Sequence, residues 1–461
     1  MIEGESLARL LLDHPCPADE PLVCTIKGEM TAEAFRSAAQ AVADQLRDDG
    51  VRPGEAVAVR LPDGAEIAAA MFGVWLAGAV FVPVNARQPE QEVAGVLDAV
   101  RPAALLDAGG LRRLRSPASF EPDVAFVMWT SGTTGAPKPI LHTHAGYREI
   151  LDRVLSTIPR RDATTRPAPN LIPVSLTLSA GLYNTLFGLM AGASVVLMER
   201  FVAQDFATLV ARYGIRSTVL PPAAMVMLTD DAGITGLAPL RYVRSITAPL
   251  SPLAARRFMD KFGVTVLNGY GQSEVGEVIG WTAADARAHP DKLGAAGRPH
   301  PGVDIKVVDD RGVVLGPGVP GELLVRPPRM AAGYAGGESL ADRVDGEGFV
   351  RTGDYAVVDD EGFVWIEGRA TDLINRGGHK VFPDQVEEVL RLVPGVEEAA
   401  VAGYRTPAWE RCRWRSWWAT PPMPTWRRCA GSIWWPTRCR SRSVGCPPSR
   451  AARWASCCAA S

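Results

Sequence analysis

Residues with phosphate-binding chemistry are concentrated in one short stretch of the chain. The stretch follows an apolar run, Val124 to Met128, that predicts a buried strand, so the polar residues fall in the loop at the strand's carboxyl end. Glycines let backbone N–H groups approach an anion, hydroxyls add donors, and lysine adds a positive charge. The loop residues are Thr130, Ser131, Gly132, Thr133, Thr134, Gly135 and Lys138. They predict a phosphate site.

A P-loop and a plain solvated turn are the alternatives for this loop. A P-loop follows the pattern G-x-x-x-x-G-K-[ST], whereas here Gly132 and Gly135 are three residues apart and Pro137 precedes the lysine. The spacing excludes a P-loop. A plain turn stays open from this loop alone, because Ser, Thr and Gly are common in turns.

Two further polar segments carry candidate ligand-binding groups. Gly269 to Glu274 follows the predicted strand Val264 to Asn268, and ligands of open α/β sheets gather at the carboxyl ends of strands. Its glutamate is a carboxylate of the kind that a hard cation requires. Asp354, in the segment Arg351 to Asp354, could accept hydrogen bonds from both hydroxyls of a ribose.

The string TSGTTGAPK resembles the phosphate-loop signature of the adenylate-forming superfamily, which comprises acyl- and aryl-CoA synthetases, peptide-synthetase adenylation domains and luciferases. Other segments resemble this AMP-binding family in the right order, over residues 1 to 405. They are Gly269-Tyr270-Gly271-Gln272-Ser273-Glu274, Arg351-Thr352-Gly353-Asp354, Gly368-Arg369-Ala370-Thr371-Asp372 and Arg376-Gly377-Gly378-His379-Lys380.

The resemblance implies a two-step ligase reaction. A carboxylic acid would react with ATP and Mg²⁺ to give an acyl- or aryl-adenylate, and a thiol of CoA or of a carrier protein's phosphopantetheine would then displace AMP. Lys138, Glu274 and Arg369 are the expected catalytic residues. The implied contacts are Lys138 and its loop on the phosphates, Tyr270 on adenine with Gly271 and Gln272 beside it, Ser273 on the α-phosphate, Glu274 on Mg²⁺, and Asp354 and Arg369 on the ribose.

The resemblance also implies where the acid and the thiol bind. The expected acid pocket comprises Leu176, Thr177, Gly181, Thr247, Ala248 and Pro249, and the expected thiol tunnel comprises Gly377 and Gly378. Amino-acid-activating relatives carry an aspartate near Leu176 and Thr177. Neither of these side chains can neutralise an ammonium group, and burying an unpaired cation is costly. We therefore expect an apolar or aromatic acid rather than an α-amino acid.

The elements around these segments predict an α/β protein. Helical apolar spacing over residues 31 to 50 precedes a buried run, Val57 to Val59, and the helix Ala65 to Ala79 precedes another, Val80 to Val84. Such alternation favours parallel sheet covered by helices. We expect two α/β parallel-sheet subdomains, then a small β-barrel-like subdomain over about 303 to 325, then a small α+β C-terminal lid. The expected domains are 1-367, a hinge at 368-372, and the start of the lid at 373-408.

Composition describes an ordinary globular protein of 461 residues with a formal net charge of −2. Neither nucleic acid nor a membrane is implied as a partner, and the N-terminus has neither a secretory nor a membrane-spanning pattern, so we expect a cytoplasmic protein. Only Cys16 and Cys24 precede residue 400, and they form no metal-ligand pattern. His142 and His144 lack a nearby carboxylate or cysteine, so we expect local hydrogen bonds rather than catalysis.

Residues 409-461 do not have the composition of a folded domain. They hold eight of the twelve Trp and six of the eight Cys, one acid (Glu410) and no Lys. In the neighbouring reading frame Trp and Cys codons give aliphatic residues, and Trp454 to Ala460 can encode Gly-Lys-Leu-Leu-Arg-Arg, similar to the family's C-terminal lysine motif. We therefore interpret the tail as frameshifted and disordered. An alternative function follows: a catalytically impaired nucleotide-binding module without that lysine.

Overall fold

The computed structural model describes most of the chain before residue 404 and two short strands after it. The described residues are 6–129, 138–158, 167–335, 340–376, 379–391, 393, 396, 399–403, 426–429 and 433–436. The chain divides into two compact units, Met1–Thr371 and Asp372–Ser461. The boundary lies near the hinge that the sequence predicts at 368-372, and the hinge motion itself stays a prediction.

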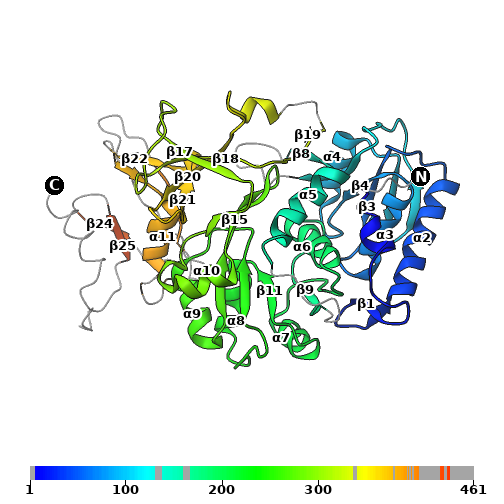
Figure 1. The fold of residues 1–461 in the computed structure, drawn as a ribbon, viewed down its shortest axis with the longest axis horizontal. Coiled ribbons are helices and arrows are strands. Elements are labelled where there is room, and N and C mark those ends of the chain that lie inside the picture. The colour runs from blue at the N-terminus through cyan, green and yellow to red at the C-terminus, as the bar shows by residue number, and fades with distance from the viewer. Residues whose placement is uncertain are drawn as a thin grey trace. The chain divides into compact units, whose positions relative to one another are not determined.

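The first large sheet of the N-terminal unit has seven strands, most of them from the first 143 residues (Figure 1). Their order is β19 (Gly333–Tyr334), β8 (Pro139–Thr143), β7 (Val124–Trp129), β4 (Val80–Pro83), β3 (Ala56–Arg60), β5 (Ala104–Asp107) and β6 (Gly110–Arg113). Strands β7, β4, β3 and β5 run parallel, while β8, β19 and β6 pair antiparallel at the two edges. The polar loop after β7 therefore closes an antiparallel hairpin with β8, which is not the strand-to-helix connection of a P-loop.

The second large sheet also has seven strands and is parallel except at one edge. Its order is β13 (Thr265–Asn268), β12 (Tyr242–Ser245), β11 (Ser217–Leu220), β9 (Asn170–Ile172), β10 (Val195–Leu197), β1 (Pro21–Cys24) and β2 (Glu29–Thr31). Helices alternate with these strands along the chain, as the apolar spacing predicts. The helices of the N-terminal unit are α1 (Arg9–Leu12), α2 (Ala32–Asp48), α3 (Ala65–Leu76), α4 (Glu90–Val100), α5 (His144–Leu155), α6 (Ser179–Met190), α7 (Ala203–Arg212), α8 (Pro222–Asp230), α9 (Pro252–Phe262) and α10 (Ala283–Ala288).

Helices α2 and α3 show how local sequence sets the packing of these elements. The Thr31 hydroxyl accepts a hydrogen bond from the Ala34 N–H and caps the start of α2, and Gly50 at a φ of 76° follows its end. Helix α3 is apolar on all sides and almost wholly buried, which is typical of a helix enclosed by other elements. Figure 1 shows α3 between α2 and the strands β3 and β4.

One apolar cluster is shared by both large sheets. It joins side chains of α2 and α3 to residues of β3, β4 and β7 from the first sheet and of β9 and β10 from the second. Phe72 and Trp75 lie edge to face within it, with ring centroids 5.3 Å apart. The two α/β subdomains that the sequence predicts therefore share a continuous core.

Two smaller antiparallel sheets form the small β subdomain, which spans more of the chain than the residues 303 to 325 that the sequence predicts, because its strands begin at Tyr270 and end at Arg369. The four-stranded sheet has the order β17 (Asp304–Val308), β18 (Gly321–Arg326), β20 (Val350–Val358) and β21 (Val364–Arg369). The three-stranded sheet has the order β14 (Tyr270–Gln272), β15 (Gly276–Gly280) and β16 (Arg298–Pro299). A bridge between Gly297 and Val364 joins them, and their apolar residues share one cluster. The mixed α/β fold with two large sheets and small β-sheets is the predicted fold class.

The C-terminal unit begins with a short hairpin and a helix. The hairpin pairs β22 (Ile374–Arg376) with β23 (His379–Val381), and helix α11 (Pro383–Arg391) follows. Ile374 and Val401 are buried together with three partly buried apolar residues, Val381, Val386 and Leu390. The start of the predicted lid therefore has a small apolar core of its own.

The tail contains one element that the sequence analysis did not expect. Strands β24 (Trp426–Cys429) and β25 (Ile433–Pro436) pair antiparallel, with Arg427 opposite Trp435. Trp and Ile are residue types that favour strands. The tail that we expect to be disordered therefore contains one paired element at this hairpin. The other residues of 409-461 lie outside the described part, and the frameshift stays a prediction.

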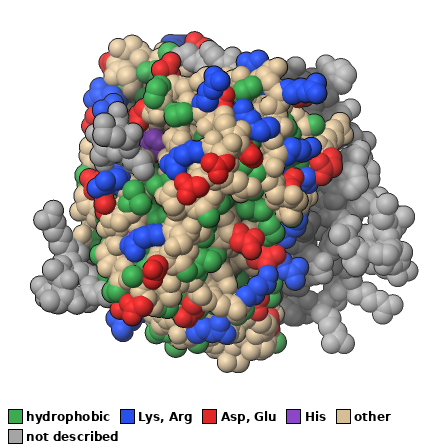
Figure 2. Space-filling view, turned by 90° about the vertical axis from the view of Figure 1, so that its right-hand side faces the viewer, with side chains coloured by type: hydrophobic (Ala, Val, Ile, Leu, Met, Phe, Trp, Pro, Cys, Tyr) green, Lys and Arg blue, Asp and Glu red, His purple; other side chains and the backbone are tan. Residues whose placement is uncertain are grey.

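The surface of the described residues is mixed in charge. On the face drawn in Figure 2, Lys and Arg side chains are interspersed with Asp and Glu side chains and with apolar residues. Within the described ranges, no helix is both long and apolar enough to cross a membrane.

Candidate active site

The predicted phosphate loop connects Trp129 at the end of β7 to Pro139 at the start of β8, and these two residues are cross-strand partners. Its residues Thr130, Ser131, Gly132, Thr133, Thr134 and Gly135 lie outside the described part of the chain. Lys138 is exposed, and its Nζ lies 5.5 Å from the centroid of the Tyr334 ring on β19. The structure therefore places the predicted phosphate lysine beside a tyrosine that is 196 positions later in the sequence.

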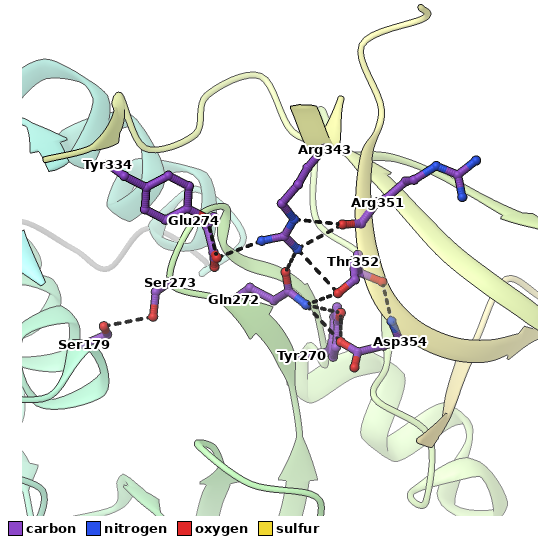
Figure 3. A network of polar contacts seen from close by, with 10 residues as sticks. All are labelled: Ser179, Tyr270, Gln272, Ser273, Glu274, Tyr334, Arg343, Arg351, Thr352 and Asp354. Atoms are coloured by element: carbon purple, nitrogen blue, oxygen red, sulfur yellow. Dashed lines mark hydrogen bonds and ion pairs between the residues drawn. The ribbon is translucent and has the colours of Figure 1, made fainter. Parts of the chain in front are cut away.

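The segment Gly269 to Glu274 lies beside Asp354 on β20. The Tyr270 hydroxyl donates to Asp354 Oδ2 at 2.5 Å, and Gln272 Nε2 donates to the same oxygen at 3.0 Å (Figure 3). Burial and the Asp354 carboxylate together raise the pKa of Tyr270 well above its ordinary value, so the phenol stays protonated and acts as the donor. On the other side, Arg369 Nε lies 2.9 Å from Asp354 Oδ1. Three of the predicted nucleotide-binding residues therefore meet around the buried carboxylate of a fourth, Asp354.

Backbone geometry fixes this group of side chains. A Cβ at Gly271 would lie 2.3 Å from the Gly276 carbonyl oxygen, so the strand pair β14–β15 requires glycine there. Thr352 is buried and donates from its hydroxyl to the Leu323 carbonyl, while the same hydroxyl oxygen accepts from the Asp354 N–H. These bonds set the position of Asp354 along β20.

Glu274 follows β14 and is 8% exposed. Its Oε1 accepts from Arg343 Nη1 at 2.8 Å and from the Tyr334 hydroxyl at 3.2 Å, and its carbonyl accepts from the Ala331 N–H at 2.7 Å. The neighbouring Ser273 hydroxyl lies 3.1 Å from that of Ser179 at the start of α6. The predicted metal ligand is therefore held in a defined position close to the predicted phosphate contacts.

The donor set fits Mg²⁺ better than a metal held by protein ligands alone. Among the described residues no group of three or more His, Cys, Asp or Glu could hold a metal ion. Mg²⁺ commonly takes one or two carboxylates and completes its shell with water and substrate phosphates. A single buried carboxylate such as Glu274 meets that requirement.

Arg343 is a residue of this site that the sequence analysis did not identify. It ends the short 3-10 helix Leu340–Arg343 and contacts Gln272 as well as Glu274. Burial opposes its charge, but the Glu274 carboxylate and the Tyr334 hydroxyl raise its pKa above the ordinary value. Nothing in the local sequence pattern distinguishes this arginine from the surrounding charged residues.

The predicted acid-pocket residues differ in their surroundings. Leu176 is fully buried in the shared core, and its N–H donates to Asp63 Oδ1 at 2.8 Å. Thr177 lies 2.7 Å from the Ser175 hydroxyl, and a Cβ at Gly181 would lie 1.9 Å from the Ser175 carbonyl oxygen. Leu176 and Thr177 thus lie in a tight turn that packs against Gly181 in the first turn of α6, where packing requires glycine.

The other three predicted pocket residues, Thr247, Ala248 and Pro249, are exposed after β12. Thr247 adopts a φ of 75°, a conformation that β-branched residues rarely adopt. The chain therefore makes a turn here with a backbone conformation that glycine adopts most readily. The predicted tunnel residues Gly377 and Gly378 lie outside the described part of the chain.

A second charged group lies next to the Gly269 segment and was also missed by the sequence analysis. Arg244 on β12 forms an ion pair with Glu277 Oε1 on β15, and His300 Nε2 lies 3.1 Å from the same oxygen. Although burial opposes its charge, the Arg244 guanidinium and the His300 contact lower the pKa of Glu277 to about 2. The carboxylate is therefore ionised near neutral pH.

The two histidines after Lys138 are structural, as the sequence predicts. His142 is buried and stacks on Phe126 with ring centroids 4.8 Å apart, and burial lowers its pKa to about 3 despite a hydrogen bond to the Ser273 backbone. His144 begins α5, and its Nδ1 accepts from the Leu7 N–H at 3.1 Å. Among the described residues neither histidine forms a hydrogen bond or ion pair with a carboxylate side chain, although the Asp123 charge partly offsets the effect of burial on the pKa of His144.

Comparison with known proteins shows which family the chain belongs to. The AMP-binding enzyme family matches residues 15–122 and 107–335. The chain is 31% identical to the long-chain-fatty-acid–CoA ligase FadD13 of Mycobacterium tuberculosis, over 82% of this chain and 81% of that protein. It is 32% identical to feruloyl-CoA synthase of an Amycolatopsis species, with the same coverage of each chain. The crystal structure of the anthranilate CoA ligase AuaEII in complex with anthranoyl-AMP is similar, with a TM-score of 0.75 and 25% identity over 86% of this chain and 83% of that one.

Proposed function

Because the chain belongs to the AMP-binding enzyme family of acid–thiol ligases, we propose that it converts a carboxylic acid and ATP into an acyl-adenylate and then into a thioester. In the first step a carboxylate oxygen attacks the α-phosphorus, and the bond to the bridging oxygen breaks to release pyrophosphate. In the second step a thiol attacks the acyl carbonyl, loses its proton, and releases AMP. CoA or a separate carrier protein supplies the thiol.

One observation carries this proposal: Tyr270, Gln272 and Arg369 converge on the Asp354 carboxylate, with Glu274 held on the adjoining segment. Asp354 would accept hydrogen bonds from the ribose hydroxyls, and the Tyr270 ring would lie against adenine. Lys138 and the loop before it would hold the phosphates, and Ser273 would contact the α-phosphate. Positioning and charge neutralisation supply much of the catalysis in such a site.

Glu274 would hold Mg²⁺, which neutralises phosphate charge when it is bound. The side chain is buried and already orientated by Arg343 and Tyr334, so little conformational freedom is lost when it binds a cation.

For the substrate we propose an apolar or aromatic carboxylic acid. The predicted pocket residues Leu176 and Thr177 offer no carboxylate for an α-ammonium group, and relatives with similar sequences act, by their names, on long-chain fatty acids and on ferulate. A panel of aryl acids, medium-chain and long-chain acids and free amino acids tests this proposal by ATP–pyrophosphate exchange. Preferred exchange with an amino acid contradicts it.

The test of adenylation is acid-dependent ATP–pyrophosphate exchange by the full chain. Glu274→Gln removes the proposed metal ligand and should lower the exchange rate by about 10²–10³. Glu149→Gln is a matched control, because Glu149 lies in an exposed ion pair with Arg329 on the surface. Equal rates for the two variants contradict the role of Glu274, and absence of exchange with every acid contradicts turnover by this chain.

A second candidate function is a nucleotide-binding module without turnover, and the absence of lysine from residues 409–461 favours it. The family's C-terminal lysine would meet the charge that develops as pyrophosphate leaves, and loss of one such preorganised charge costs on the order of 10²–10³ in rate. Calorimetry with ATP beside the exchange assay separates the two functions. Binding without exchange supports the second candidate, while full activity of the 461-residue chain contradicts it.

A further inference from the structure

We propose that Arg343 is a positioning residue that ties the metal side of the nucleotide site to its ribose side. The inference rests on the proposed function, because it adds a residue to that same site. Arg343 lies 69 residues after Glu274 in the sequence, yet its guanidinium reaches Glu274 and Gln272 as well as the backbone of β20 (Figure 3).

The guanidinium of Arg343 is fixed from three directions. Nη1 donates to Glu274 Oε1 at 2.8 Å, and Nη2 donates to Gln272 Oε1 at 3.0 Å and to the Arg351 carbonyl at 2.9 Å. The Arg351 carbonyl also accepts from Nε at 3.3 Å. A planar group held at several nitrogens has one orientation, so the side chains that it contacts share that orientation.

Arg343 determines which way the Gln272 amide faces. A guanidinium has donors and no acceptor, so the amide atom that faces it must be the oxygen. The amide nitrogen is then directed to the opposite side, where it donates to Asp354 Oδ2 at 3.0 Å and to the Thr352 carbonyl at 2.8 Å. Without Arg343 the amide loses the contact that selects this orientation, and the predicted ribose carboxylate loses a defined donor.

Arg343 also fixes the carboxylate of Glu274. The contacts from Arg343 and from the Tyr334 hydroxyl both end on Oε1. Among the described residues no hydrogen bond or ion pair ends on Oε2, so this oxygen is the one left for a cation. Partners of this kind orientate a metal ligand, and their loss typically weakens metal affinity by about 10–100-fold.

Two possible roles of Arg343, positioning of Glu274 and competition with the cation, predict opposite changes in metal affinity when the arginine is replaced. A guanidinium that merely competes with the cation for Glu274 would weaken metal binding, so its removal would tighten that binding. A guanidinium that holds the carboxylate in place strengthens metal binding, so its removal would weaken it. The direction in which metal affinity changes on removal of the Arg343 side chain therefore distinguishes positioning from competition.

The experiment uses the full chain and Mn²⁺ as the probe, with a non-hydrolysable ATP analogue present. Bound Mn²⁺ is measured by electron paramagnetic resonance, and the affinity of the analogue alone is measured by calorimetry without metal. For Arg343→Gln we expect Mn²⁺ affinity to fall by about 10–100-fold and analogue affinity to fall as well, because Gln272 is released. Arg329→Gln is the matched control: it removes an exposed arginine paired with Glu149 and should change neither value.

Arg343→Lys keeps the positive charge next to Glu274 but lacks the planar fork that reaches Gln272. We expect Arg343→Lys to keep most of the Mn²⁺ affinity of the unsubstituted chain and little of its affinity for the ATP analogue. If Arg343→Gln does not fold, the lysine variant tests the proposal by these two affinities. Unchanged or tighter Mn²⁺ binding by Arg343→Gln, or full recovery of both affinities by lysine, overturns the proposal. If the unsubstituted chain does not bind the ATP analogue, that result contradicts the proposed function rather than the role of Arg343.

Discussion

Asp354 and Arg369 are direct cross-strand partners on β20 and β21, and Arg369 Nε lies 2.9 Å from Asp354 Oδ1. Tyr270 and Gln272 occupy the other oxygen. An ionised carboxylate accepts about four hydrogen bonds in total. Three are therefore in use, and two ribose hydroxyls can both be accepted only if one present donor gives way.

Asp354→Asn should weaken binding of the ATP analogue by about 10–100-fold, because hydrogen bonds to a charged group contribute roughly 1.5–3 kcal/mol and the asparagine is neutral. Calorimetry with the metal-free analogue measures the effect. Glu149→Gln again serves as the control for loss of one acidic charge at the surface. An unchanged affinity would exclude Asp354 from the nucleotide site.

Glu277→Gln should destabilise the protein by about 1–3 kcal/mol, because it leaves the half-buried Arg244 guanidinium without its charged partner. The double variant Arg244→Met with Glu277→Gln should recover much of that loss. Urea denaturation of both single variants and the double variant completes the cycle. Additive free energies of unfolding would show that the pair is not coupled.

The same carboxylate gives a pH dependence whose sign follows from its lowered pKa. Since the folded-state pKa is about 2 and the ordinary value is 4.5, the unfolded chain binds the proton first as the pH falls. The stabilisation is therefore complete above about pH 4.5 and is lost between that pH and about 2. Urea midpoints between pH 5 and 3 should fall less steeply in the double variant than in the unsubstituted chain.

His144→Asn should reduce the acid sensitivity of the fold. Burial lowers the pKa of His144 to about 4 from an ordinary value of 6.5, so the folded state favours the neutral ring and loses stability as the pH falls from 6.5 towards 4. The slope is at most about 1.4 kcal/mol per pH unit. Asparagine keeps an acceptor for the Leu7 N–H but does not titrate. The melting temperature of the variant and of the unsubstituted chain is measured between pH 6.5 and 4. An identical dependence on pH in the two proteins would contradict a contribution of His144 to acid sensitivity.

Thr247→Gly should stabilise the protein by about 1 kcal/mol, because glycine adopts the φ of 75° without the strain of a β-branched side chain. Thr247→Ala is the matched control, since it removes the branch but keeps a Cβ at positive φ, and its gain should be smaller. Differential scanning calorimetry compares the three proteins. A larger gain for alanine than for glycine would show that the backbone is not the source of the strain.

The sequence by itself determined the elements whose evidence is local. The runs around Val57 and Val80 form strands, and the spacing over residues 31 to 50 forms a helix, because burial on a sheet or on one helix face imposes a period that is visible within a few residues. Turn residues and strand ends also placed the Gly269 segment and Asp354 in loops and strands where ligands collect. The resemblance of the sequence motifs to the adenylate-forming superfamily agrees with the match to the AMP-binding enzyme family.

Only the tertiary structure decided which of these residues meet. Arg343 contacts Glu274 across 69 positions, and Arg244 pairs with Glu277 across 33, in segments where no spacing rule connects the partners. Ion pairs of this kind depend on how β12, β14, β15 and β20 are placed, which follows from packing of the whole unit. Local periodicity describes which face of an element is buried, but it carries no information about the charge that lies opposite. The positioning role of Arg343 could therefore be inferred only once the chain was folded.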